Sequence, residues 1–187
     1  MKRPLTNIRI AGSGGQGIVV VGNLIARACV IEGKNVVGMV AYGAEMRGGA
    51  AHATVIVSDE EIACPFVETP DMAIIFNQPS LDCFEASIVP NGLILLNTSM
   101  VQRPVVRKDL EQVHLAATEL AHGLGNLKVA NIITLGAFIQ HTKLLTMDSI
   151  QQAIGDLFAS KNPKMVELNL HALEVGAKNY TCRNVRA

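Results

Sequence analysis

Apolar stretches of two lengths alternate along the chain, and turn residues separate them. Short runs rich in Val, Ile, Leu, Met and Ala are typical of buried strands. Longer runs with one apolar side are typical of helices that pack against a sheet. The predicted strands are residues 7–11, 35–40, 51–57, 62–66, 72–76, 93–97 and 112–116. The predicted helices are residues 15–32, 81–86, 130–142, 147–159 and 163–177, with a short one opening at Thr118.

This alternation of strands and helices predicts an α/β fold with a mainly parallel sheet flanked by helices. We expect a single Rossmann-like domain over residues 1–187, because the length suits one domain and the sequence contains no long linker or repeat.

Composition agrees with a sheet that is buried on both faces, since 49% of the residues are apolar and only 17% are charged. A surface hidden against partner subunits would explain the same composition, and the two explanations are compatible. The net charge is zero and no basic run occurs, which argues against nucleic-acid binding. No apolar run reaches membrane-span length and no signal peptide is recognisable, so we expect a cytoplasmic protein without membrane contact.

The cysteines and histidines are dispersed. None of the four cysteines forms a CxxC pair, and no histidine pair has a metal-ligand spacing. We therefore expect free thiols and no metal or iron–sulfur cluster in this chain.

A glycine-rich turn, GSGGQG, follows the first predicted strand and opens the first predicted helix. Its spacing is that of a dinucleotide-binding turn, and the helix N-terminus attracts anions. However, the second strand ends in Met39-Val40-Ala41, where an NAD site needs an acid for the ribose. The turn either binds a phosphate or carboxylate, such as part of CoA, or forms a tight turn at a subunit contact. The candidate residues are Gly12, Ser13, Gly14, Gly15, Gln16 and Gly17.

A second special loop, AYGAEMRGGA, follows the second strand. Arg47 is suited to clamp a carboxylate or a CoA phosphate. Alternatively, it pairs with Glu45 or with another chain and shapes an interface. The candidates in this loop are Tyr42, Gly43, Glu45, Arg47, Gly48 and Gly49.

Asn77 and Gln78 follow the strand over residues 72–76, which should end at the same sheet edge as both glycine-rich loops. Their amides either contact a ligand or cap the next helix, and capping is the expected role of Asn77. Asn131, at the start of an apolar helix, should cap it or bond to a neighbouring loop.

Several stretches together resemble the gamma subunit, or gamma domain, of 2-oxoacid:ferredoxin oxidoreductases. In family order they are GSGGQGIVVVGNLIARA, AYGAEMRGGAAHATVIVS, PDMAIIFNQPSLDCFE, NGLILLNTS, KVANIITLGAF and VELNLHALEVG. They cover residues 8 to 177, and the NQPS stretch is most similar to the 2-oxoglutarate type within a family that also takes pyruvate and ketoisovalerate.

The resemblance implies a subunit of an enzyme of anaerobic metabolism that converts a 2-oxoacid and CoA to acyl-CoA and CO2 and passes the electrons to ferredoxin. It also implies that thiamine diphosphate, Mg2+ and iron–sulfur clusters reside in partner alpha, beta and ferredoxin-like subunits. The isolated chain would then be inactive, would have no catalytic residue of its own, and would self-associate through its apolar surface. The competing interpretation is a self-contained nucleotide-binding module.

Overall fold

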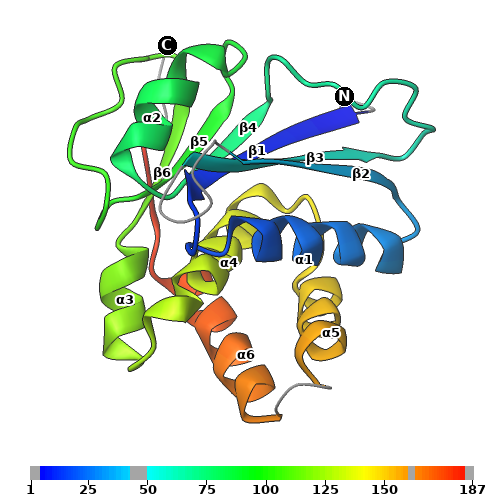
Figure 1. Cartoon of the computed structure of the whole chain (residues 1–187), viewed down its shortest axis with the longest axis vertical. Coiled ribbons are helices and arrows are strands. Elements are labelled where there is room, and N and C mark those ends of the chain that lie inside the picture. Colours follow the sequence, from blue (N-terminus) through cyan, green and yellow to red (C-terminus); the bar gives the residue numbers. More distant parts are fainter. Residues whose placement is uncertain (1–4, 43–49, 160–162, 184–187) are drawn as a thin grey trace.

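The structure is a computed structural model, and it describes residues 5–42, 50–159 and 163–183, leaving aside the side chains of Tyr42 and Ala50. These residues form one seven-stranded sheet in the order β2-β3-β1-β4-β5-β6-β7 (Figure 1). Its strands are β1 (Leu5–Ser13), β2 (Asn35–Tyr42), β3 (Ala50–Ser58), β4 (Met72–Ile75), β5 (Leu93–Asn97), β6 (Glu111–Leu115) and β7 (Thr181–Arg183).

Five strands run in one direction, and β3 and β7 run against them. Strand β1 pairs in parallel with β4, β4 with β5, and β5 with β6. Strand β3 lies between β1 and β2 and is antiparallel to both. The seven residues between β2 and β3 are too few for a crossover to a parallel strand, so these two strands form a hairpin.

Helices lie on both faces of the sheet, as predicted (Figure 1). One face carries α1, α4, α5 and α6, whereas α2 packs on the other. The helices are α1 (Ile18–Ile31), α2 (Gln78–Phe84), α3 (Ala117–Gly123), α4 (Ala130–Thr142), α5 (Met147–Phe158) and α6 (Pro163–Lys178), with short 3-10 turns at Glu85–Ser87 and Leu127–Val129. No helix within the described ranges is long and apolar enough to cross a membrane.

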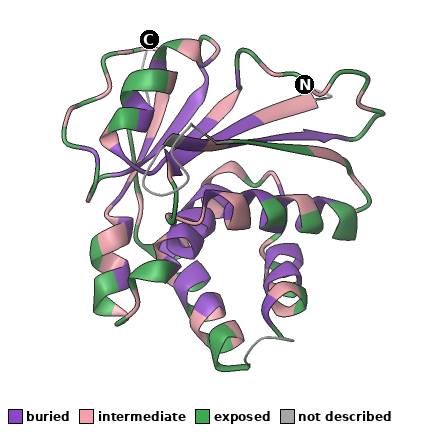
Figure 2. Cartoon of the chain, in the orientation of Figure 1, coloured by how far each residue is buried: buried purple, intermediate pink, exposed green. Residues whose placement is uncertain are grey.

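The central strands are buried on both faces, which explains their continuous apolar sequence. Ile8 and Ile10 of β1 face the α1 side, and Ile75 of β4 faces the α2 side. Every residue of β5 is buried. Figure 2 shows the buried residues gathered on the central strands and on the helix surfaces beneath them.

Two details differ from the sequence prediction. Residues 62–66 are not a strand. Pro65 has no N–H to donate to a ladder, and the places beside β1 and β3 are already taken. Pro65 and Phe66 instead lie over the sheet face near Arg9, and the next residue, Val67, accepts a hydrogen bond from Arg9 through its carbonyl. Strand β7 was not predicted, because its three exposed residues carry no periodic pattern.

Candidate functional site

The glycine-rich turn and Asn77 meet at one edge of the sheet. Strands β1 and β4 are parallel, so the residues that follow Ser13 and Ile75 emerge side by side. The Asn77 amide donates from Nδ2 to Ser13 Oγ over 2.8 Å and to Gln16 Oε1 over 3.0 Å. The structure therefore places Asn77 and the GSGGQG turn at the same carboxyl edge, as expected for this one of the two glycine-rich loops.

Gln16 closes the turn with its own side chain. Its Oε1 accepts a hydrogen bond from Ser13 N at 2.7 Å, and its backbone N–H donates to Ser13 O at 3.1 Å. A Cβ on Gly12 would lie only 2.6 Å from Gln16 Oε1, so the glycine is needed for this arrangement. In a dinucleotide site the first glycine forms the tight turn and the second admits the pyrophosphate; here Gly12, the first of the three, also leaves room for the Gln16 amide.

Gly17 connects the turn to a distant helix. It has a φ of 77° and lies immediately before α1. A Cβ at this position would lie 2.1 Å from Asn131 Nδ2, and that amide also donates to the Gly17 carbonyl at 3.4 Å. Asn131 is buried near the start of α4, so the prediction that it bonds to a neighbouring loop is confirmed.

The two amides after β4 have different roles. Asn77 caps α2, because its Oδ1 accepts a hydrogen bond from Ser80 N at 3.0 Å. Gln78 turns away from the glycine-rich turn, and its Oε1 accepts from the backbone N–H groups of Gln102 and Arg103, both at 2.9 Å. Gln78 therefore anchors the connection after β5.

Among the described residues, the start of α1 gives this edge its electrostatic character. No side chain caps α1, and its first turn contains no acidic residue. The first N–H groups of a helix have no partner within the helix and carry its positive dipole. Gly14 and Gly15 are exposed beside them. The arrangement can receive an anion or the acidic group of another chain.

The topology disfavours a self-contained dinucleotide site. In such sites the strand that carries the ribose-binding acid lies beside the first strand. In this sheet the antiparallel β3 separates β1 from β2, and the last residues of β2 before Tyr42 are uncharged.

The second glycine-rich loop falls outside the described residues. This applies to the side chain of Tyr42 and to Gly43, Glu45, Arg47, Gly48 and Gly49, so their expected role stays a prediction.

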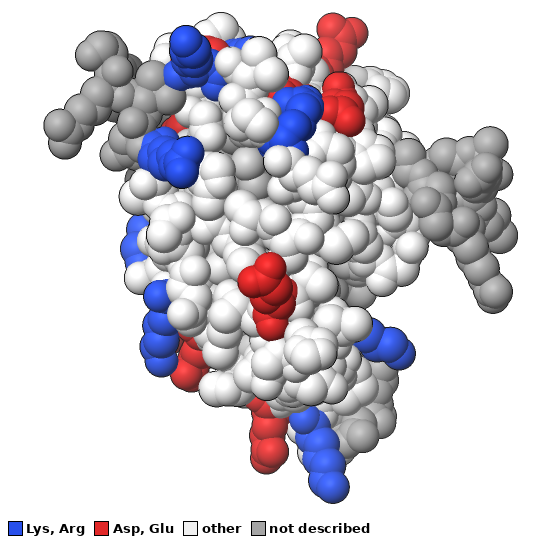
Figure 3. All heavy atoms as spheres, turned by 90° about the vertical axis from the view of Figure 1, so that its left-hand side faces the viewer, with Lys and Arg blue, Asp and Glu red and all other residues white. Residues whose placement is uncertain are grey.

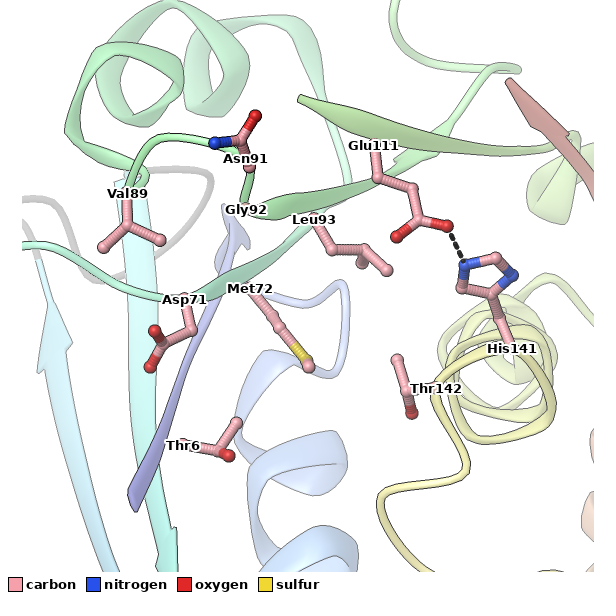
Figure 4. A pocket seen from close by; sticks show the side chains of 10 residues that line it. All are labelled: Thr6, Asp71, Met72, Val89, Asn91, Gly92, Leu93, Glu111, His141 and Thr142. Atoms are coloured by element: carbon pink, nitrogen blue, oxygen red, sulfur yellow. Dashed lines mark hydrogen bonds and ion pairs between the residues drawn. The ribbon is translucent and has the colours of Figure 1, made fainter. Parts of the chain in front are cut away.

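A cavity lies at the opposite edge of the sheet, where the parallel strands begin. It has a volume of about 520 Å³ and is lined by residues that begin β4, β5 and β6, together with the end of α4. Figure 4 shows Glu111 and His141 pointing toward one another, with 2.9 Å between Glu111 Oε1 and His141 Nε2. Asp71 also lines the cavity and accepts a hydrogen bond from Asn7 N. Its two carboxylates suit a phosphate ligand poorly, so we place the candidate site at the carboxyl edge.

Metal-ligating side chains do not gather in the described part of the chain, where no group of three or more His, Cys, Asp or Glu residues could hold an ion. Cys29 lies within α1 and is buried in the core. Burial, with a smaller contribution from nearby Glu32, raises the pKa of its thiol to about 12, which keeps it protonated at neutral pH. The other cysteines, Cys64, Cys83 and Cys182, are free and exposed.

Sequence reasoning missed one further group, around Arg9. Arg9 is 8% exposed in the middle of β1, and its guanidinium carbon lies 5.2 Å from the centroid of the Phe84 ring. A charged residue within an otherwise buried apolar strand was the signal that could have identified it.

Comparison with known proteins places nearly the whole chain in one family. The family model for pyruvate ferredoxin/flavodoxin oxidoreductase matches residues 7–179. The ketoisovalerate oxidoreductase subunit VorA of Methanothermobacter marburgensis is 35% identical over 91% of this chain, which spans only 35% of that relative. The 2-oxoglutarate synthase subunit KorC of Methanocaldococcus jannaschii is 34% identical over 80% of this chain and 81% of its own length.

A solved structure agrees over a similar extent. The gamma subunit of a keto/oxoacid ferredoxin oxidoreductase from Geobacter sulfurreducens has a TM-score of 0.77 and 28% identity. The match covers 92% of this chain and 96% of that one.

Proposed function

Because the chain belongs to the pyruvate ferredoxin/flavodoxin oxidoreductase family, we propose that it is the gamma subunit of a cytoplasmic 2-oxoacid:ferredoxin oxidoreductase. The complex converts a 2-oxoacid and CoA to acyl-CoA and CO2, and oxidised ferredoxin accepts the electrons. This chain contributes to assembly and to CoA access, and it is inactive alone. The VorA and KorC relatives are named for different acids at nearly equal identity, so the substrate is set mainly by other chains. 2-Oxoglutarate is the first acid to test.

The observation that carries this proposal is the way the chain fills its own glycine-rich turn. Gln16 and Asn131 occupy the spaces that Gly12 and Gly17 leave, so these glycines serve internal packing. A turn held by the half-buried Gln16 amide and the buried Asn77 and Asn131 amides suits a rigid contact surface. Together with the antiparallel β3 that separates β1 from β2, this supports a subunit role over a self-contained nucleotide-binding module.

The division of labour assigns thiamine diphosphate, Mg2+ and the iron–sulfur clusters to partner chains. The alpha and beta subunits would hold the thiamine, and a ferredoxin-like subunit would carry electrons. The dispersed cysteines of this chain and their free state support that assignment, because cluster ligation requires grouped thiolates.

The surface supports a subunit role in a larger complex. Figure 3 shows a face whose centre is mostly uncharged, with most Lys and Arg side chains nearer its outline. Several large apolar side chains are exposed, with Phe66 76% and Val106 73% exposed. Exposed apolar surface of this kind is typical of partner interfaces.

CoA access is assigned to the carboxyl edge. The uncapped start of α1 offers N–H groups and a positive dipole beside exposed Gly14 and Gly15. A CoA phosphate or an acidic group of a partner chain would bind to the same N–H groups and the same positive dipole.

The first experiment is anoxic co-purification of the tagged chain from its native host, followed by CoA-dependent viologen reduction with several 2-oxoacids. We expect larger thiamine- and iron–sulfur-containing chains to accompany it and to support reduction. If the chain emerges alone under conditions that preserve such complexes, and it binds NAD or FAD in a direct titration, the nucleotide-binding alternative replaces this proposal.

The role of the turn is tested with Gln16→Ala, and Gln152→Ala on the exposed side of α5 serves as the matched control. We expect the first substitution to weaken retention of partner chains and the second to leave it unchanged. Hydrogen exchange of the assembled complex with and without CoA then tests access. Failure of CoA to protect residues 13–18 would remove the CoA role and leave the assembly role standing.

A further inference from the structure

Arg9 is a buried cation whose bonding is incomplete. Its Nη2 donates to the Val67 carbonyl at 2.8 Å, and its guanidinium lies against the Phe84 ring. The Nε atom is buried and has no hydrogen-bond partner. Among the residues that the structure describes, no carboxylate forms an ion pair with Arg9. Burial lowers the pKa of the guanidinium, yet arginine stays charged in proteins.

An unpaired buried charge is energetically unfavourable, and protein interiors normally supply an opposite charge. The cation–π contact with the Phe84 ring compensates for this cost only in part. The surroundings of Arg9 therefore favour an anion that the described chain does not itself provide.

A cavity of about 150 Å³ lies beside Arg9, on the sheet face opposite α1. The strand register puts Arg9, Thr54 and Met39 in one row across β1, β3 and β2. His52 lies two residues before Thr54 in β3, on the same face of the sheet, and also lines the cavity. It packs edge-on against Phe84, with 5.1 Å between the ring centroids. Burial and the nearby Arg9 lower the pKa of His52, so it is neutral at pH 7 and adds no second cation.

The rim of the cavity is apolar and open to solvent. Phe66, Met39 and Val40 are 76%, 40% and 44% exposed, and all three line the cavity. A cavity with a cation at its bottom and apolar side chains around its opening favours a ligand that has a small acidic group on a short apolar chain.

We propose that Arg9, with Thr54 and His52, forms a binding site for a carboxylate. A guanidinium binds the planar carboxylate with two parallel hydrogen bonds, and a hydroxyl and a neutral imidazole complete the polar set. A single cation suits a monoanion better than a phosphate dianion. The carboxylate comes either from a free small acid or from an acidic side chain or chain terminus of a partner subunit. A free acid as the ligand does not depend on the proposed enzyme role, whereas a carboxylate from a partner subunit rests on it.

The first arm of the test uses the isolated chain and propionate, with propionamide as the neutral isostere. We expect propionate to shift the Arg9 Nε resonance saturably and to raise the melting temperature, whereas propionamide does neither. Arg9→Gln should weaken propionate binding at least tenfold, and Arg27→Gln, an exposed arginine of α1, should leave it unchanged. Thr54→Val gives a second, conservative variant in case Arg9→Gln does not fold.

The second arm measures retention of partner chains by the same variants in the assembled complex. Propionate binding with unaltered assembly identifies a free acid as the ligand. Weakened assembly of Thr54→Val, without propionate binding to the isolated chain, identifies a partner's carboxylate. If the wild-type Nε resonance does not respond to propionate and Thr54→Val assembles normally, the proposal is overturned.

Discussion

Helices α4 and α6 approach one another backbone to backbone at two glycines, and a methyl group added at either should force them apart. A Cβ at Gly176 would lie 1.8 Å from the Ile133 carbonyl oxygen, and one at Gly136 would lie 2.0 Å from the Leu173 carbonyl oxygen. Both obstacles are helix backbone, which cannot rotate away as a side chain does. The helices must therefore separate by more than about 1 Å to reach ordinary van der Waals distance.

The size of the effect follows from two opposed terms. Overpacking of a core costs about 1–3 kcal/mol and occasionally more, and a rigid backbone obstacle belongs at the upper end. Replacing glycine by alanine within a helix returns roughly 1 kcal/mol through propensity. We therefore expect Gly176→Ala to lower the free energy of unfolding by about 2 kcal/mol or more. In a chain of this size that is roughly 4–8 °C in melting temperature.

Gly155 of α5 is the matched control, because a Cβ there meets nothing within 4 Å. The same chemical change at Gly155 should stabilise the protein by about 0.5–1 kcal/mol. Thermal melts followed by circular dichroism, with urea midpoints at constant slope, measure both variants. Equal shifts of the same sign for Gly176→Ala and Gly155→Ala would refute the backbone contact.

Two further predictions concern titratable groups. Although burial raises the pKa of Glu32, hydrogen bonds from Thr146 and Ser149 outweigh that effect and hold it below its usual 4.5. The stabilisation is therefore present above about pH 4.5 and lost as the pH falls below it, so Glu32→Gln should destabilise the chain at pH 7 and flatten the acid limb of its stability profile. Glu167→Gln, at an exposed position of α6, should change neither the stability at pH 7 nor its decrease at acid pH. Buried Cys29 should resist iodoacetamide at neutral pH in the folded chain and react after unfolding, and rapid labelling of the native thiol, read by peptide mass spectrometry, would contradict its burial. The thiols expected to react first are Cys64, Cys83 and Cys182.

Local pattern was sufficient for most of the elements. The apolar run over residues 93–97 is β5, and that over residues 130–142 is α4 with the same bounds. Both are buried so completely that their composition alone marks them. The hairpin of β2 and β3 was harder to foresee, because periodicity reports that a strand exists and not which neighbour it pairs with.

The candidate site was predicted at the level of residues but not of contacts. The spacing in GSGGQG identified the strand-to-helix turn, and the parallel sheet rule brought Asn77 beside it. Sequence could not show that Gln16 folds back over Gly12, because a glutamine in a turn has several conformers of similar energy. The bond from Asn77 selects among them.

The sequence by itself determined the fold class, the glycine-rich turn and the scattered placement of the cysteines, since these depend on neighbours close along the chain. Only the tertiary structure decided which buried groups meet. Asn131 reaches Gly17 across 114 residues, and Arg9 lies beside the Phe84 ring and the Val67 carbonyl, with no ion-pair partner among the described residues. Such pairings depend on strand order and helix packing, and these are set by the summed burial of the whole chain, which no single stretch encodes.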